Sequence, residues 1–167
     1  MATVIQDFSP FDAVPPATNY ATLDVAAATN FPVPALDFDA ATDESSLFYF
    51  RASNYGSGNL TLKLHWYADT ASSGDVIWGA QIAAITPNTD TQDIETKAFA
   101  TAQTVTDTHL GTTGQRLHEA ELAITNLDSI ANGDWCCLKV YRDADAAGDT
   151  MTGDASLVGM SLSYSDV

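Results

Sequence analysis

Apolar and polar residues alternate along much of the chain, and Asn59–Ala68 is the clearest example. Every second residue there is apolar, namely Leu60, Leu62, Leu64 and Trp66. A helix would scatter these four side chains around its circumference, whereas a strand collects them on one face. The alternation therefore predicts a β-strand that is buried on one side.

The same alternation, or a short apolar run, recurs in six further segments. They are Ser45–Arg51, Val76–Ile85, Phe99–Thr106, Leu117–Thr125, Trp135–Arg142 and Ala155–Tyr164. Turn residues separate them, and Asn126–Ala131 is the only stretch that could hold a helical turn. Eight or nine strands at this spacing predict an all-β fold, an antiparallel double-sheet β-sandwich of the jelly-roll type.

Residues 1–19 are predicted to form an extended N-terminal arm, followed by one β-sandwich domain over residues 20–167. The arm contains three prolines that oppose a helix, Pro10, Pro15 and Pro16. Phe8 and Phe11 are its apolar anchors, and they are costly to leave in water. The arm is therefore either a frayed terminus or a strap whose Phe8 and Phe11 form an interface with a neighbouring subunit.

The charge balance narrows the range of partners. Six Lys and Arg residues stand against 22 Asp and Glu residues, which gives a formal net charge of −16. Such a chain repels phosphate, so neither nucleic acid nor an anionic membrane is an expected partner. The acidic surface either keeps the protein soluble or faces a basic partner or cations. No apolar run approaches the roughly 18 residues of a membrane span, and no secretory signal is visible.

Catalytic signatures are absent from the sequence, so no catalytic residue is assigned and the chain is not expected to be an enzyme. Glu119 and Glu121 share one strand face about 7 Å apart, which is compatible with a hydrolase, but a pair of surface acids is the favoured interpretation. Cys136 and Cys137 are adjacent on a predicted strand and point to opposite faces. They are expected to be two buried thiols.

The acidic segment Asp143–Asp154 partly resembles a calcium-binding loop. Its carboxylates Asp143, Asp145, Asp149 and Asp154 are the weak metal candidates of the chain. Ala147 stands where a ligand is needed, and strands flank the segment where the calcium motif has helices. An acidic loop between two strands, with no metal and no cofactor, is therefore the expectation, and a weak calcium site is the alternative.

Aromatic residues offer a second kind of site. A shallow sugar-binding platform would use exposed ring faces, and the candidates are Tyr49, Tyr67, Trp78 and Trp135. Most of them align with apolar neighbours on their strands, which favours core packing.

Two stretches, Leu36–Ile82 and Lys139–Tyr164, resemble a group of small virion proteins of tailed bacteriophages. The shared pattern includes "DFD" from Asp37, "GDVIW" from Gly74, "YRDA" from Tyr141 and "GDASL" from Gly153. The resemblance implies a jelly-roll sandwich without catalytic residues, placed on a phage particle as a head decoration (cement) protein or a tail-associated module.

The function expected from this resemblance is capsid decoration. The chain would assemble as a homotrimer on the outer surface of the virion head, bind between subunits of the major capsid protein, and be made in the host cytoplasm. The alternative is a tail-associated module that binds a receptor or a carbohydrate.

Overall fold

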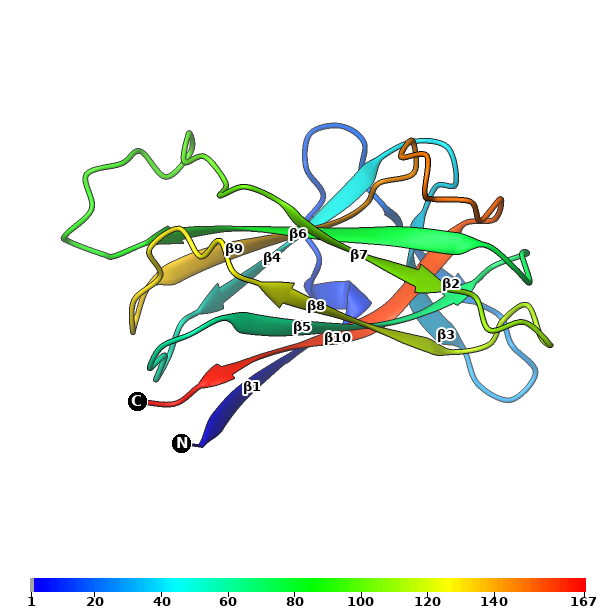
Figure 1. The fold of residues 1–167 in the computed structure, drawn as a ribbon, viewed down its shortest axis with the longest axis horizontal. Coiled ribbons are helices and arrows are strands. Elements are labelled where there is room, and N and C mark those ends of the chain that lie inside the picture. Colours follow the sequence, from blue (N-terminus) through cyan, green and yellow to red (C-terminus); the bar gives the residue numbers. More distant parts are fainter. Residues whose placement is uncertain (1) are drawn as a thin grey trace.

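The computed structural model describes residues 2–167, which form ten β-strands and one turn of 3-10 helix (Figure 1). The elements are β1 (Thr3–Phe8), η1 (Pro10–Asp12), β2 (Thr22–Ala26), β3 (Val33–Phe38), β4 (Glu44–Arg51), β5 (Leu60–Ala68), β6 (Asp75–Ile85), β7 (Gln103–Thr108), β8 (His118–Ile124), β9 (Trp135–Arg142) and β10 (Ala155–Ser165). The predicted all-β class is confirmed.

The strands form two antiparallel sheets that pack face to face as a jelly-roll sandwich (Figure 1). The six-stranded sheet has the order β2-β3-β10-β5-β8, and β1 pairs with β10 beyond the end of β3. The four-stranded sheet has the order β4-β9-β6-β7. The predicted double-sheet architecture is confirmed.

The core lies between the two sheets and is filled by the inward side of each strand. Residues of β5 alternate between buried and half-buried along its whole length, as the sequence pattern predicts. Trp66 and Trp78 meet at the centre with ring centroids 6.2 Å apart, and neither is exposed. The apolar faces of both sheets are therefore buried against each other.

The N-terminal segment differs from the expected arm. Thr3–Phe8 forms β1, which pairs antiparallel with β10 and brings the two ends of the chain together (Figure 1). Phe8 is only 9% exposed and packs on Phe48 with ring centroids 5.6 Å apart. The assignment of Phe8 to an interface is therefore wrong, because the side chain belongs to this chain's own core. Phe11 is 63% exposed, and its role at an interface stays a prediction.

The hairpin of β2 and β3 was not among the segments marked by alternation, since Pro32 and Pro34 interrupt the pattern. The segment 126–131 contains turns and, in the described chain, no helical turn. The strand expected at 99–106 begins later, at Gln103.

Cys136 and Cys137 are buried free thiols, as predicted. Burial raises the pKa of Cys136 to about 12 and that of Cys137 to about 11, so both stay protonated and unreactive at neutral pH. Within residues 2–167, no helix has the length and apolar character to cross a membrane.

Candidate functional site

The outer face of the six-stranded sheet carries side chains that the core does not use. Asp37, Ser156 and Tyr67 lie side by side in the neighbouring strands β3, β10 and β5. Because successive residues of a strand point to opposite faces, all three side chains belong to the outer face. They form a row across the sheet, with Tyr67 nearest β8.

A groove of about 520 Å³ opens beside Tyr67 on this face. The β2–β3 turn, β5, β10 and the loop before β8 supply its walls. The lining residues are Ala26, Ala27, Ala28, Phe31, Val33, Tyr67, Gln115, Leu117 and Val158. Phe31 and Leu117 are 68% and 61% exposed, and together they give the groove an apolar surface of the kind that marks binding sites.

The same face becomes polar along β5, from Tyr67 toward the start of the strand. Lys63 Nζ donates a hydrogen bond to Glu119 (2.7 Å) and lies 3.4 Å from Glu121, while His65 Nε2 lies 2.9 Å from Glu119. The hydrogen bond from Lys63, assisted by His65, holds the pKa of Glu119 below its usual range. A general acid needs a raised pKa, so Glu119 is suited to accept hydrogen bonds and not to donate a proton.

The four aromatic candidates separate into different environments. Trp78 is completely buried, so the core packing favoured by its strand pattern is confirmed for this residue. Tyr49 and Trp135 stack on the outer face of the four-stranded sheet, with centroids 5.4 Å apart, and line an open groove with Arg51. Tyr67 lines the groove of the six-stranded sheet. The structure therefore offers paired aromatic rings on both outer faces, Tyr49 with Trp135 on the four-stranded sheet and Tyr67 with Phe31 on the six-stranded sheet.

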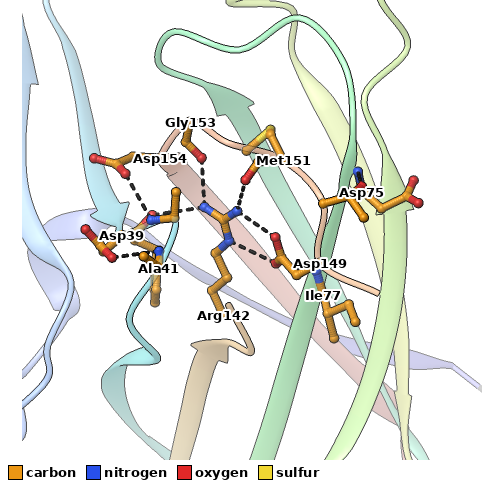
Figure 2. A network of polar contacts seen from close by, with 12 residues as sticks. Asp39, Ala41, Asp75, Ile77, Arg142, Asp149, Met151, Gly153 and Asp154 are labelled. Atoms are coloured by element: carbon orange, nitrogen blue, oxygen red, sulfur yellow. Dashed lines mark hydrogen bonds and ion pairs between the residues drawn. The ribbon is translucent and has the colours of Figure 1, made fainter. Parts of the chain in front are cut away.

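The acidic loop after β9 is organised by a buried arginine (Figure 2). Arg142 Nε and Nη2 donate to the two carboxylate oxygens of Asp149 at 2.9 and 2.7 Å. Its remaining donors reach the carbonyl oxygens of Met151 (2.8 Å), Gly153 (2.9 Å) and Phe38 (3.4 Å). Asp149 also accepts from the backbone N–H of Ile77 at 3.0 Å. This network ties the loop to β9, to β6 and to the end of β3.

The four carboxylates expected as weak metal ligands do not converge. Asp149 is bound by Arg142, and Asp154 accepts a hydrogen bond from Ala40 N (Figure 2). Asp143 and Asp145 instead approach Asp43, and ligand atoms of these three side chains lie within 4.8 Å of one another. A four-residue set is therefore excluded by the geometry, and the three-residue cluster is the only such grouping in residues 2–167.

Two buried histidines support the loop that borders the groove. The His118 ring stacks on Trp66 with centroids 4.6 Å apart, and the His109 ring lies 4.5 Å from that of His118. The backbone N–H of Leu110 donates to His118 Nε2, and that of Gly111 donates to His109 Nδ1, both at 3.0 Å. Each ring must keep an unprotonated nitrogen to accept its bond, so the loop requires both histidines to be neutral.

This arrangement predicts that acid weakens the fold. Burial, with the neighbouring His109, holds the pKa of His118 below 6.5. In the unfolded chain the ring titrates near its ordinary value, so below roughly pH 6.5 the unfolded state binds more protons than the folded state. The free energy of unfolding is therefore expected to be constant just above this pH and to fall as the pH decreases through it.

Denaturant titrations between neutral pH and about pH 5 measure this slope. His118→Gln is expected to flatten the slope, because glutamine keeps an acceptor for Leu110 N but does not titrate. His65→Gln, on the exposed outer face, is the matched control and is expected to keep it. Equal slopes in wild type and His118→Gln would contradict the assignment.

Sequence reasoning named Tyr67 but missed the rest of the groove. Phe31, Gln115, Leu117 and Val158 come from three separate segments, and Phe31 and Gln115 lie outside the segments that the alternation marked. Phe31, an aromatic residue between Asn30 and Pro32, was the one available signal in the sequence. Which residues meet Tyr67 depends on strand register, which the sequence pattern does not supply.

No protein-family model and no curated protein sequence matches the chain. Solved structures do resemble it. The isomalto-dextranase of Arthrobacter globiformis T6, complexed with panose, matches with a TM-score of 0.57 and 13% identity over 95% of this chain. A family 35 carbohydrate-binding module from an environmental isolate matches with a TM-score of 0.50 and 10% identity, covering 97% of this chain and 92% of the module.

The insecticidal crystal protein Cry2Aa also matches, with a TM-score of 0.50 and 12% identity over 96% of this chain and 21% of that protein. This chain spans 23% of the isomalto-dextranase, so it corresponds to one domain of a larger protein there. At these identities the likeness shows the jelly-roll sandwich fold alone. Carbohydrate-binding modules share that fold, and no virion protein is among these three structures.

Proposed function

We propose that this chain is a carbohydrate-binding domain without catalytic residues, and that its ligand lies in the groove bordered by Phe31 and Tyr67. The observation that carries the proposal is the groove itself, an aromatic-lined hollow on a sheet face that continues into hydroxyl-bearing and charged side chains. The fold shared with a family 35 carbohydrate-binding module supports the same assignment.

The lining of the groove matches the chemistry of a sugar ring. A pyranose has apolar C–H faces and a rim of hydroxyl groups, and it needs both kinds of surface from a protein. Phe31, Tyr67 and Leu117 offer apolar area for the ring face, while the amide of Gln115 offers a donor and an acceptor for hydroxyls. Binding sites for small molecules combine these two features, mostly apolar walls with a few placed polar groups.

The polar rows next to the groove extend the surface for a longer ligand. Ser161 lies beside Lys63, and Ser163 beside Thr61, on the outer face of β10 and β5. Successive rows are about 7 Å apart along the strands. A saccharide chain that leaves the groove along β5 therefore meets the hydroxyls of Ser161, Thr61 and Ser163 and the ammonium of Lys63.

Neither the groove nor the similar structures support the expected capsid decoration. Its homotrimer, its major capsid partner and its place on the outer surface of the head stay predictions, and Phe8 no longer contributes to them because it is buried. The alternative function expected from the sequence was a carbohydrate-binding module, and the lining of the groove agrees better with this alternative. Whether such a module is tail-associated also stays a prediction.

Replacing Tyr67 with alanine is expected to weaken glycan binding about 30-fold, since losing a central aromatic contact costs about 2 kcal/mol in a binding site. Affinity electrophoresis against dextran, xylan and a soluble cellulose derivative identifies the ligand, and calorimetry then measures the loss. Tyr20→Ala is the control, because Tyr20 is a surface tyrosine that does not line this groove.

Two outcomes would contradict the proposal. If none of the polysaccharides binds the wild-type chain, or any other glycan on a broad array, carbohydrate binding is wrong. If Tyr49→Ala abolishes binding while Tyr67→Ala leaves it intact, the site lies instead on the outer face of the four-stranded sheet, where Tyr49 and Trp135 stack.

A further inference from the structure

The loop between β7 and β8, residues 109–117, forms one wall of the groove. Gln115 and Leu117 lie in this loop, and both line the groove. The loop begins at His109, the residue after β7, and is followed by His118, the first residue of β8. Both histidines are buried. The contacts between the loop and these two rings therefore set the position of the groove wall.

Three hydrogen bonds tie the loop to the imidazole rings. Leu110 N–H donates to His118 Nε2, and Gly111 N–H donates to His109 Nδ1, both at 3.0 Å. The other nitrogen of His109, Nε2, donates to the carbonyl oxygen of Gly114 at 2.7 Å. An imidazole nitrogen can accept a hydrogen bond only while it carries no proton. The closed loop therefore requires both rings to be neutral.

Protonation of His118 removes an acceptor that the closed loop needs. Its Nε2 then carries a hydrogen that points at the N–H of Leu110, so that two donors face each other across 3.0 Å. The hydrogen bond is lost, and both buried donors stay unsatisfied as long as the loop keeps its position. A proton on Nδ1 of His109 has the same effect on the N–H of Gly111. When the loop moves outward, these N–H groups can reach water.

The other side-chain attachments of the loop are weaker. Gln115 Nε2 donates to the carbonyl oxygen of Asp69, and Arg116 Nη1 to that of Leu110, and both bonds are long at 3.4 Å. Thr112 has a φ of 73°, a left-handed conformation that a β-branched residue rarely adopts. Such a conformation persists only where the surrounding contacts enforce it. Loss of the imidazole bonds therefore favours a different conformation of the loop.

The groups around His118 decide when it takes up a proton. Its ring stacks on Trp66 of β5 with centroids 4.6 Å apart, and the His109 ring lies 4.5 Å away. Asp107 of β7 and Arg116 of the loop are the charged residues beside it. Burial, the neighbouring His109 and Arg116 together outweigh the attraction of Asp107, so the pKa of His118 lies below 6.5. The ring is therefore neutral at neutral pH and becomes charged in acid.

We propose that acid opens the groove, because a proton on His118 or His109 releases the β7–β8 loop and carries Gln115 and Leu117 away from the ligand. This inference rests on the proposed carbohydrate-binding function and adds a regulation to its site. The sheets stay paired while the loop opens, since the β5–β8 and β6–β7 ladders consist of backbone hydrogen bonds that do not titrate. The groove therefore binds its ligand at neutral pH and releases it in acid.

NMR of the ligand-free chain tests the opening directly. The amide resonances of Leu110 and Gly111 are expected to shift between neutral pH and about pH 5, in step with the imidazole resonances of His118 and His109. Far-ultraviolet circular dichroism is expected to keep its β-sheet signal over the same range. If the two amides do not respond, or if the sheet signal is lost as they do, local opening of the loop is wrong.

Calorimetry tests the effect on affinity, with dextran and hydroxyethyl cellulose as probes because neither carries a titratable group. The affinity of the wild-type chain is expected to be constant above about pH 6.5 and to fall in acid. The limit is about tenfold for each pH unit, as for one proton that is taken up when the ligand leaves. Equal affinity at neutral pH and at about pH 5 overturns the proposal.

Histidine variants assign the effect to the two rings. His118→Gln is expected to remove most of the fall in affinity, because glutamine accepts from Leu110 N without taking up a proton. The double variant with His109→Gln is expected to remove the rest. His65→Gln is the matched control, since His65 is the third histidine of the chain and lies on the exposed sheet face. If His65→Gln removes the fall, or the double variant keeps it, another group is responsible and the proposal is overturned.

Failure of the acid opening and failure of the proposed function give different results. Binding that does not depend on pH overturns the acid opening and leaves carbohydrate binding intact. Loop movement without a fall in affinity also overturns it, because the loop is then not part of the binding wall. If only another uncharged glycan binds, it replaces the two probes. If no glycan binds at neutral pH, the proposed function is wrong, and its regulation by acid is wrong with it.

Discussion

Replacing Arg142 with methionine is expected to lower the free energy of unfolding by about 3–5 kcal/mol, the usual cost of breaking a buried ion pair by removing one partner. The side chain is completely buried and donates to Asp149 and to three backbone carbonyls. Methionine fills most of the volume but satisfies none of these acceptors. The Asp149 carboxylate then stays buried without its counter-ion.

Chemical denaturation monitored by tryptophan fluorescence measures the effect. Asp149→Asn is expected to be destabilising as well, because it leaves the guanidinium buried without a carboxylate. Lys63→Met is the matched control, since Lys63 forms its ion pairs on the exposed face, and little change is expected there. A wild-type denaturation midpoint for Arg142→Met would show that the network does not stabilise the fold.

Replacing Trp78 with alanine is expected to cost about 3–5 kcal/mol, as large-to-small changes of buried aromatic residues do. Trp78 contacts Phe38 and Trp66 at the centre of the sandwich, with centroids 5.1 and 6.2 Å apart. Removing the indole leaves a cavity that the two sheets cannot close. Thermal or denaturant unfolding measures the loss, and any fall in glycan binding is expected to follow the fraction unfolded.

The phenylalanine variants of the two central tryptophans provide a sharper comparison. The indole N–H of Trp78 has no hydrogen-bond partner in the described chain, whereas Trp66 Nε1 donates to Asp107 at 2.7 Å. Trp78→Phe removes an unpaired buried donor, and Trp66→Phe leaves an acceptor without its donor. Trp66→Phe is therefore expected to be the more destabilising change, and the reverse order would contradict this account of the core.

Strand positions could be predicted wherever one face of a strand is buried and the other is polar. In β5 and β8, burial imposes a period of two on the sequence, and the pattern could be read directly. The hairpin of β2 and β3 lies at the edge of the sheet, where most residues of β2 are exposed and the alternation is lost. β1 was interpreted as an arm because the prolines that follow it suggested extension without pairing.

Less of the candidate site than of the fold could be predicted from the sequence. Tyr67 was recognisable as an aromatic residue on a polar strand face, and Trp78, which aligns with Val76 and Ala80, was recognisable as a core residue. The acidic loop suggested four ligands, and the sequence pattern did not show that Arg142 would bind one of them. The structure turns Asp149 toward that arginine and leaves Asp143 and Asp145 with Asp43, which is about a hundred residues away in the chain.

The sequence by itself determined the all-β class, the inward faces of the central strands, the buried thiols and the acidic charge, because each depends on local periodicity or on composition. Only the tertiary structure decided that Phe8 belongs to the core, that Arg142 closes the acidic loop, and that Phe31, Tyr67 and Leu117 border one groove. These outcomes depend on which strands pair and in which register. Pairing joins residues far apart in the chain, so no local pattern records it.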